Sequence, residues 1–254
     1  MSFLAFSALL FLASVAVTAV WGRSMSAMGG MQMPGGWTMS MAWMRMPGQS
    51  WPGSAASFVA MWVVMTTAMM LPSLVLMLRR YRRAVAPTPR AGLNRLTLVV
   101  SLGYFAVWAA IGLAIFPIGV SLAELSMRQP ALARAVPMAT GMAVLLAGAG
   151  QFTSWKMRHL VGCMRAAGRG SRLTADTPAA WRHGLCLGRH CSQACAGLTV
   201  VMLVGGVMDL TVIAAVASAI TIERCAPLHL RATRVIGAAV IAAGVHQMAR
   251  AAGL

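Results

Sequence analysis

The sequence predicts an all-α protein, a polytopic transmembrane helix bundle with about six spans and seven as the alternative. Apolar residues make up 59% of the 254 residues, charged residues make up 10%, and the mean hydropathy is +0.75. A water-soluble surface usually needs about 25% charged residues, so most of this chain faces something other than water. Apolar stretches of bilayer-crossing length recur along the chain, and basic residues gather in two of the loops between them.

We expect one integral membrane domain, residues 1–254, with six apolar stretches as spans. In chain order these are residues 3–21, 55–78, 96–120, 136–155, 194–222 and 235–249. We expect the first to be an uncleaved helix rather than a signal peptide cut near residues 17–19, because it lacks a basic leading segment and its apolar run is long. For the fifth we prefer one long, tilted or kinked helix; a break at Gly205-Gly206 would make a hairpin and a seventh span.

Basic residues set the expected orientation, because cytoplasmic loops carry an excess of Lys and Arg. The 79–95 loop has six arginines and no acid, and the 156–190 segment has seven basic residues and one acid. The 23–54 and 121–135 loops have two arginines each, so we expect these two loops outside and the N-terminus inside. The sequence therefore predicts a multi-pass protein of a bacterial inner membrane, with 23–54 as an extracytoplasmic loop and 156–190 as a basic cytoplasmic loop.

The net charge of +17 arises from 21 basic residues against four acids. Arginines at the ends of membrane segments pair with anionic lipid, so the lipid bilayer is the expected partner and nucleic acid is not. The acids are too scattered for glycosidase, aspartic-protease or two-metal hydrolase chemistry. The chain also lacks GxxxxGK[ST], GxGxxG and GxSxG, so we expect neither an enzyme nor an ATP-driven pump.

The 23–54 loop is rich in methionine, with the spacing MxxMxxMxM followed by MxMxxMxM. The eight residues are Met25, Met28, Met31, Met33, Met39, Met41, Met44 and Met46. Thioethers are neutral, soft ligands that prefer Cu(I) or Ag(I) to hard ions, and they need no deprotonation. The alternative is a hydrophobic loop that lies along the membrane interface. The absence of Leu, Ile and Phe among these methionines favours metal binding.

The second span contains Met61, Met65 and Met69 at positions i, i+4 and i+8, which share one face of a helix. Such a stripe serves either as packing or as a track of soft ligands. Pro72 removes a helical hydrogen bond and predicts a kink.

A third group of candidate ligands lies at the expected cytoplasmic edge of the fifth span. It consists of His183, Cys186, His190, Cys191 and Cys195. Thiolate and imidazole together suit Cu(I) or Zn(II), and Arg182 and Arg189 would favour the thiolates. The usual CxxC spacing is missing, so small-residue packing is the alternative. Cys163 and Cys225 could join only if the fold brings them in.

Asp209 is the only charge deep in a span if 194–222 crosses intact, and intramembrane carboxylates are usually functional. It would then contact an ion, relay a proton or pair with an arginine. The alternative is that Asp209 is solvated beside a break at Gly205-Gly206. His159, His229 and His246 are expected at the interfaces.

The segment MWVVMTTAMMLPS (residues 61–73) resembles the MWxxMxxAMMLPS signature of a bacterial family of predicted metal-binding integral membrane proteins. Further segments are similar to those of the family in the same order: GYFAVW at 103–108, Gln151, Thr153, Lys156 and Cys163, the glycine/cysteine segment 184–195, GVMDL at 206–210, and Glu223-Arg224. The chain departs from the family at Ala194-Cys195-Ala196, where two adjacent cysteines and a Trp are usual, at Asp209 for Asn and at Arg224 for Lys. The resemblance covers roughly residues 55–245 and implies a membrane protein that binds metal.

We expect the protein to handle Cu(I) by binding, delivery or passage, without catalysis, and to exchange copper with a metal donor or acceptor protein. Two alternatives remain. One is a membrane redox subunit holding haem or quinone, and the other is a scaffold or assembly subunit of a larger membrane complex.

Overall fold

The computed structural model describes residues 3–45, 48–85, 90–168, 176–225 and 229–253. Met46 lies outside the described residues, as do the side chains of Cys163, Cys225 and His229. The described chain is almost entirely helical, which confirms the all-α class. Its helices are α1 (Phe3–Ala27), α2 (Trp51–Ala84), α3 (Arg90–Arg128), α4 (Pro130–Gly150), α5 (Ser154–Gly168), α6 (Thr177–Gly206), α7 (Leu210–Cys225) and α8 (His229–Ala251). Between α1 and α2 lie a two-stranded antiparallel hairpin, β1 (Met31–Met33) and β2 (Trp37–Met39), and the 3-10 turn η1 (Met41–Trp43).

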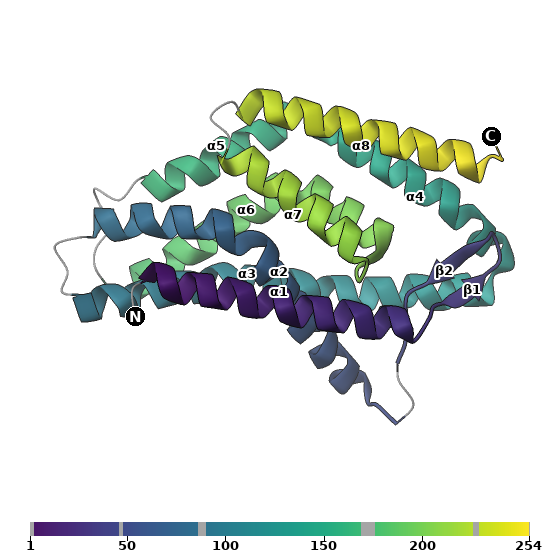
Figure 1. Cartoon of the computed structure of the whole chain (residues 1–254), viewed down its shortest axis with the longest axis horizontal. Coiled ribbons are helices and arrows are strands. Elements are labelled where there is room, and N and C mark those ends of the chain that lie inside the picture. Colours follow the sequence, from purple (N-terminus) through teal and green to yellow (C-terminus); the bar gives the residue numbers. More distant parts are fainter. Residues whose placement is uncertain (1–2, 46–47, 86–89, 169–175, 226–228, 254) are drawn as a thin grey trace.

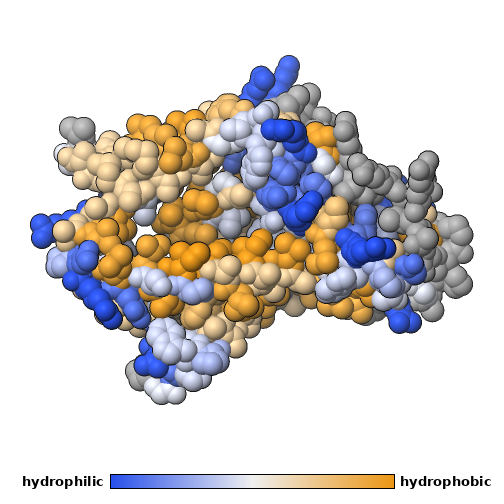
Figure 2. Space-filling view, turned by 180° about the vertical axis from the view of Figure 1, so that it is seen from behind, coloured by the Kyte–Doolittle hydropathy of each residue, from blue (hydrophilic) through white to orange (hydrophobic). Residues whose placement is uncertain are grey.

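Five of the described helices, α1 to α4 and α8, are long and apolar enough to cross a membrane. Their outer faces are apolar too: Leu12 and Val20 on α1 are each 61% exposed, and Val235 on α8 is 70% exposed. Figure 2 shows hydrophobic residues spread widely over one face of the molecule. An exposed apolar surface of this extent is compatible with a lipid environment and costly in water.

Figure 1 shows the ends of several helices at two opposite ends of the molecule. The arginine-rich end of α2 lies at the end where α1 begins, and the hairpin lies at the other end, beside the junction of α3 and α4. The indole Nε1 of Trp37 donates to the carbonyl of Ala133 at 2.8 Å, which ties the hairpin to α4.

The prediction of one long helix over 194–222 is wrong. The chain breaks at Gly206, whose φ of +121° is a conformation that residues with a side chain rarely adopt. Asp209 then starts α7, because its Oδ1 accepts hydrogen bonds from the backbone N–H groups of Thr211 at 2.8 Å and Val212 at 3.2 Å. The break lies where the hairpin alternative placed it, and α7 packs against α6. Neither α6 nor α7 is among the five described helices that are long and apolar enough to cross a membrane, so the seventh span of that alternative is not shown.

The 156–190 segment differs from the expected loop. It contains most of α5 and the first half of α6, so the Cys/His group lies on a helix. The preceding span also ends earlier than expected, at Gly150, where three residues separate α4 from α5. Thr153 starts α5: its Oγ1 accepts from the N–H of Lys156 at 3.4 Å and donates to the carbonyl of Gly150 at 2.7 Å.

Helix α6 occupies the centre of the bundle and packs against α3, α4, α5 and α7. Its closest neighbour is α3, because glycines remove the side chains that would separate the two backbones. A Cβ on Gly184 would lie 2.3 Å from the carbonyl oxygen of Val100, and one on Gly103 would lie 2.7 Å from that of Trp181. A Cβ on Gly188 would lie 2.9 Å from the carbonyl oxygen of Tyr104. These glycines therefore bring Tyr104 against the middle of α6.

Candidate metal centre

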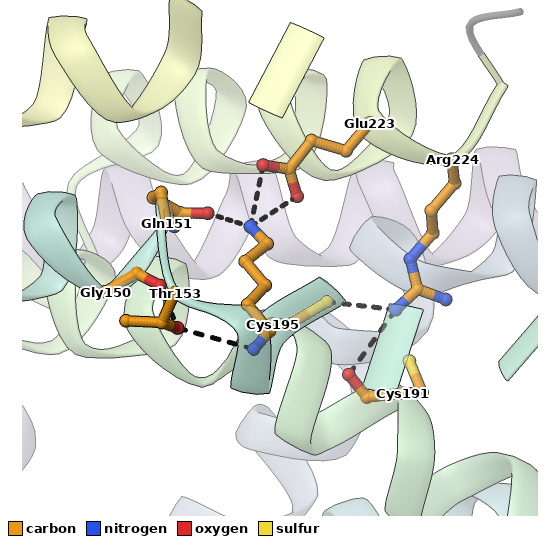
Figure 3. Close-up of polar contacts among 8 residues, drawn as sticks. Gly150, Gln151, Thr153, Cys191, Cys195, Glu223 and Arg224 are labelled. Carbon is orange, nitrogen blue, oxygen red and sulfur yellow. Dashed lines mark hydrogen bonds and ion pairs between the residues drawn. The ribbon is translucent and has the colours of Figure 1, made fainter. Parts of the chain in front are cut away.

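Two thiols lie one helical turn apart on α6, in the interior of the bundle. Cys191 is 0% exposed and Cys195 is 1% exposed. The Sγ of Cys191 is 2.7 Å from the Oη of Tyr104, and the Sγ of Cys195 accepts from Nη2 of Arg224 at 3.1 Å. The same Nη2 also donates to the backbone carbonyl of Cys191 at 3.4 Å (Figure 3). The site thus combines a dithiol, a phenol and a guanidinium from α6, α3 and α7.

This arrangement suits a soft monovalent metal. Thiolate sulfur selects Cu(I) over hard ions, and a buried pair of thiolates around one Cu(I) carries a net negative charge. The adjacent guanidinium of Arg224 offsets part of that charge. Arg182 and Arg189, the arginines expected to do this, are both exposed, and Arg224 takes their place.

A buried ion pair lies beside the dithiol. The Nζ of Lys156 is 2.7 Å and 2.8 Å from the two carboxylate oxygens of Glu223, and it also donates to the amide oxygen of Gln151. Lys156 and Glu223 are only 3% and 2% exposed. The pair joins the start of α5 to the end of α7. Because Glu223 directly precedes Arg224, the pair also fixes the backbone from which Arg224 reaches Cys195.

The candidate ligands chosen from the sequence did not include Tyr104, Gln151, Lys156, Glu223 or Arg224. The sequence nonetheless contained an indication of these residues, because all five belong to the segments that carry the family resemblance. Their positions in the chain are far apart, and only the packing of α3, α5 and α7 around α6 brings them together.

The Cys/His group on α6 does not meet at one point. The ring of His183 stacks on Tyr81 of α2 at 5.2 Å, whereas His190 faces His159 of α5. Cys186 is half-buried and lies in neither contact. Within the described residues, no group of three or more His, Cys, Asp and Glu side chains is arranged to hold a metal ion. Asp209 was expected to lie deep in a span only if 194–222 crosses intact; it is exposed in the turn between α6 and α7, beside the break at Gly206 that the alternative assumed.

The hairpin gathers part of the methionine-rich loop. Met31 pairs with Met39 across the strands, and Met33 lies two residues from Met31, so the three thioethers share one face, which we call the thioether face. Met33 and Met39 are buried against Ala123 and Ala133, while Met31 is exposed. The remaining described methionines lie on either side of the hairpin: Met25 and Met28 before it, Met41 and Met44 after it.

The methionine stripe on α2 is part of the core. Met65 and Met69 are buried, Met61 is half-buried, and all three pack in the cluster that contains Trp62. The indole Nε1 of Trp62 donates to the carbonyl of Trp108 at 2.9 Å, which joins α2 to α3. This environment favours packing over a ligand track. Pro72 lies within α2, which bends along its course (Figure 1).

These features define a nearly all-helical protein with membrane-length apolar helices and a buried dithiol at its centre. Residues 59–247 match the PpoB2 family, described as a copper chaperone. The chain belongs to this family. The matched region contains the dithiol, Arg224 and the Lys156–Glu223 pair, and it begins after the methionine-rich loop. No match was found among curated proteins or among solved structures.

Proposed function

We propose that this protein is a membrane copper chaperone that binds Cu(I) between Cys191 and Cys195 and exchanges it with a partner protein, without catalysing a reaction. Membership of a copper-chaperone family supports the copper link. The observation that carries the choice of site is the pair of buried thiols in contact with Arg224 and Tyr104. Asp209 and the three remaining members of the Cys/His group are not part of this proposed dithiol site.

The chemistry of transfer follows from the same contacts. A two-coordinate Cu(I) bis-thiolate can accept a third soft ligand from a partner, which lets the metal move without being released into water. Arg224 stabilises the thiolate of Cys195 while the metal is exchanged, and the hydroxyl of Tyr104 can donate a hydrogen bond to Cys191 when that thiol is deprotonated.

The thioether face forms a second soft-metal site in this proposal, on the extracytoplasmic side of a bacterial inner membrane. Neutral thioethers bind Cu(I) in an oxidising compartment, where a reduced thiol would not persist. The C-terminal end of α2 and the N-terminal end of α3, which carry the six arginines of the 79–95 loop, then face the cytoplasm.

The test is the copper stoichiometry of the full-length, tag-free protein in detergent, loaded with Cu(I) in the presence of a competing chelator. The double variant Cys191→Ser/Cys195→Ser should lose one copper equivalent at unchanged folded yield. Cys186→Ser is the matched control, because Cys186 lies on the same helix away from the dithiol, and it should retain the metal. Equal copper content in the double variant and the wild type would refute the dithiol site. A visible spectrum with a haem band would instead favour the redox-subunit alternative.

A further inference from the structure

Two histidines from different helices face one another across the packing of α5 on α6. The Nδ1 atoms of His159 and His190 are 3.5 Å apart, and both side chains are half-buried. The ring centroids are 5.7 Å apart with an angle of 38° between the planes. At this separation the contact lies at the long limit of a hydrogen bond between ring nitrogens.

The separation fits a metal ion shared by both nitrogens. With a metal–nitrogen bond of about 2.05 Å, a nitrogen separation of 3.5 Å corresponds to an angle of about 117° at the metal, between trigonal and tetrahedral.

The local packing holds both rings in this arrangement. Gly162 lies on α5 beside His190, and a Cβ there would be 3.1 Å from the Nδ1 of His190, so glycine leaves the room that the ring occupies. Trp155 packs edge-on against His159, with ring centroids 4.7 Å apart. A neutral imidazole is a good ligand for copper and other first-row transition metals.

We propose that His159 and His190 form an imidazole site for a copper ion, separate from the dithiol. The proposal rests on the proposed copper-handling function for the identity of the metal, and on the geometry of the two rings for the site itself. His190 directly precedes Cys191, so the two sites occupy adjacent positions on α6. Two nitrogen ligands leave coordination positions open to a side chain of the protein that exchanges copper. The pair thus serves as the exchange site next to the sulfur site.

The experiment is X-ray absorption and metal analysis of the tag-free, full-length protein loaded with Cu(I) in detergent. The wild type should show both sulfur and nitrogen ligands to copper. His159→Ala should lose the nitrogen contribution and one copper equivalent, while keeping the sulfur contribution. The matched control is His246→Ala, which changes an exposed histidine on α8 and should leave both unchanged. If His159→Ala does not fold, His159→Gln fills the same space with an amide and is judged by the same criteria.

The outcomes separate this inference from the proposed function. Unchanged nitrogen ligation and copper content in His159→Ala would overturn the imidazole site, even if Cys191→Ser/Cys195→Ser loses copper. Loss of nitrogen ligation in His159→Ala together with unchanged copper in the cysteine double variant would support the imidazole site and refute the dithiol.

Discussion

Replacing Lys156 by Met should destabilise the fold more than most single substitutions. Lys156→Met keeps a long apolar side chain but leaves the carboxylate of Glu223 buried without its cation. Removing one partner of a buried pair typically costs about 3–5 kcal/mol, because the remaining charge must be desolvated alone. The amine contacts both carboxylate oxygens of Glu223 and the amide oxygen of Gln151, so we expect the free energy of unfolding to fall by an amount within this range.

The double variant Lys156→Met/Glu223→Leu provides the decisive comparison. It removes both charges and fills the space with apolar groups, which is often neutral or stabilising for a buried ion pair. We therefore expect the double variant to be more stable than either single variant, with a coupling energy of at least about 2 kcal/mol.

The assay is equilibrium unfolding in mixed micelles, followed by far-UV circular dichroism for the wild type, both single variants and the double variant. Arg158→Met is the matched control on α5, because Arg158 is exposed, and it should change stability by less than about 0.5 kcal/mol. A cost below about 1 kcal/mol for Lys156→Met, or a double variant whose cost equals the sum of the singles, would show that these side chains are not a buried pair.

Three further predictions concern packing, the thioether face and orientation. Gly184→Ala should destabilise the fold by about 1–3 kcal/mol, since its Cβ would lie 2.3 Å from the carbonyl oxygen of Val100; Gly150→Ala, with open space at that position, is the control in the same unfolding assay. Changing the three residues of the thioether face to Leu should weaken Ag(I) binding at least tenfold in a chelator-competition titration. The wild-type affinity at that site should hardly change between pH 7 and about pH 5, because thioethers bind no protons; a strong pH dependence would contradict thioether binding. A cysteine introduced at position 172 should react with an impermeant reagent only from the cytoplasmic side, and one at position 36 only from outside; the reverse pattern would overturn the orientation.

The helical class and most helix positions were predictable from the sequence. Apolar stretches of membrane length have a simple cause, the cost of exposing apolar residues to water, and this cost depends on composition along the chain rather than on distant partners. The predicted spans 3–21, 55–78, 96–120 and 235–249 therefore all fall inside described helices. The break at Gly206 was foreseen only as the alternative, because a continuous apolar run does not reveal whether a glycine within it adopts a positive φ.

For the candidate sites too, some features were visible in the sequence and others depend on the tertiary structure. Sequence alone determined that the chain is rich in soft ligands, because the types and spacing of Met, Cys and His are visible there, and helical spacing placed Cys191 and Cys195 on one face. Only the tertiary structure decided which residues meet. Lys156 and Glu223 are 67 positions apart, and His159 and His190 are 31 apart, so each contact depends on how α5 and α7 pack on α6. The position of α6 against α3 depends in turn on close backbone approaches at Gly103, Gly184 and Gly188, a three-dimensional property that neither composition nor periodicity contains.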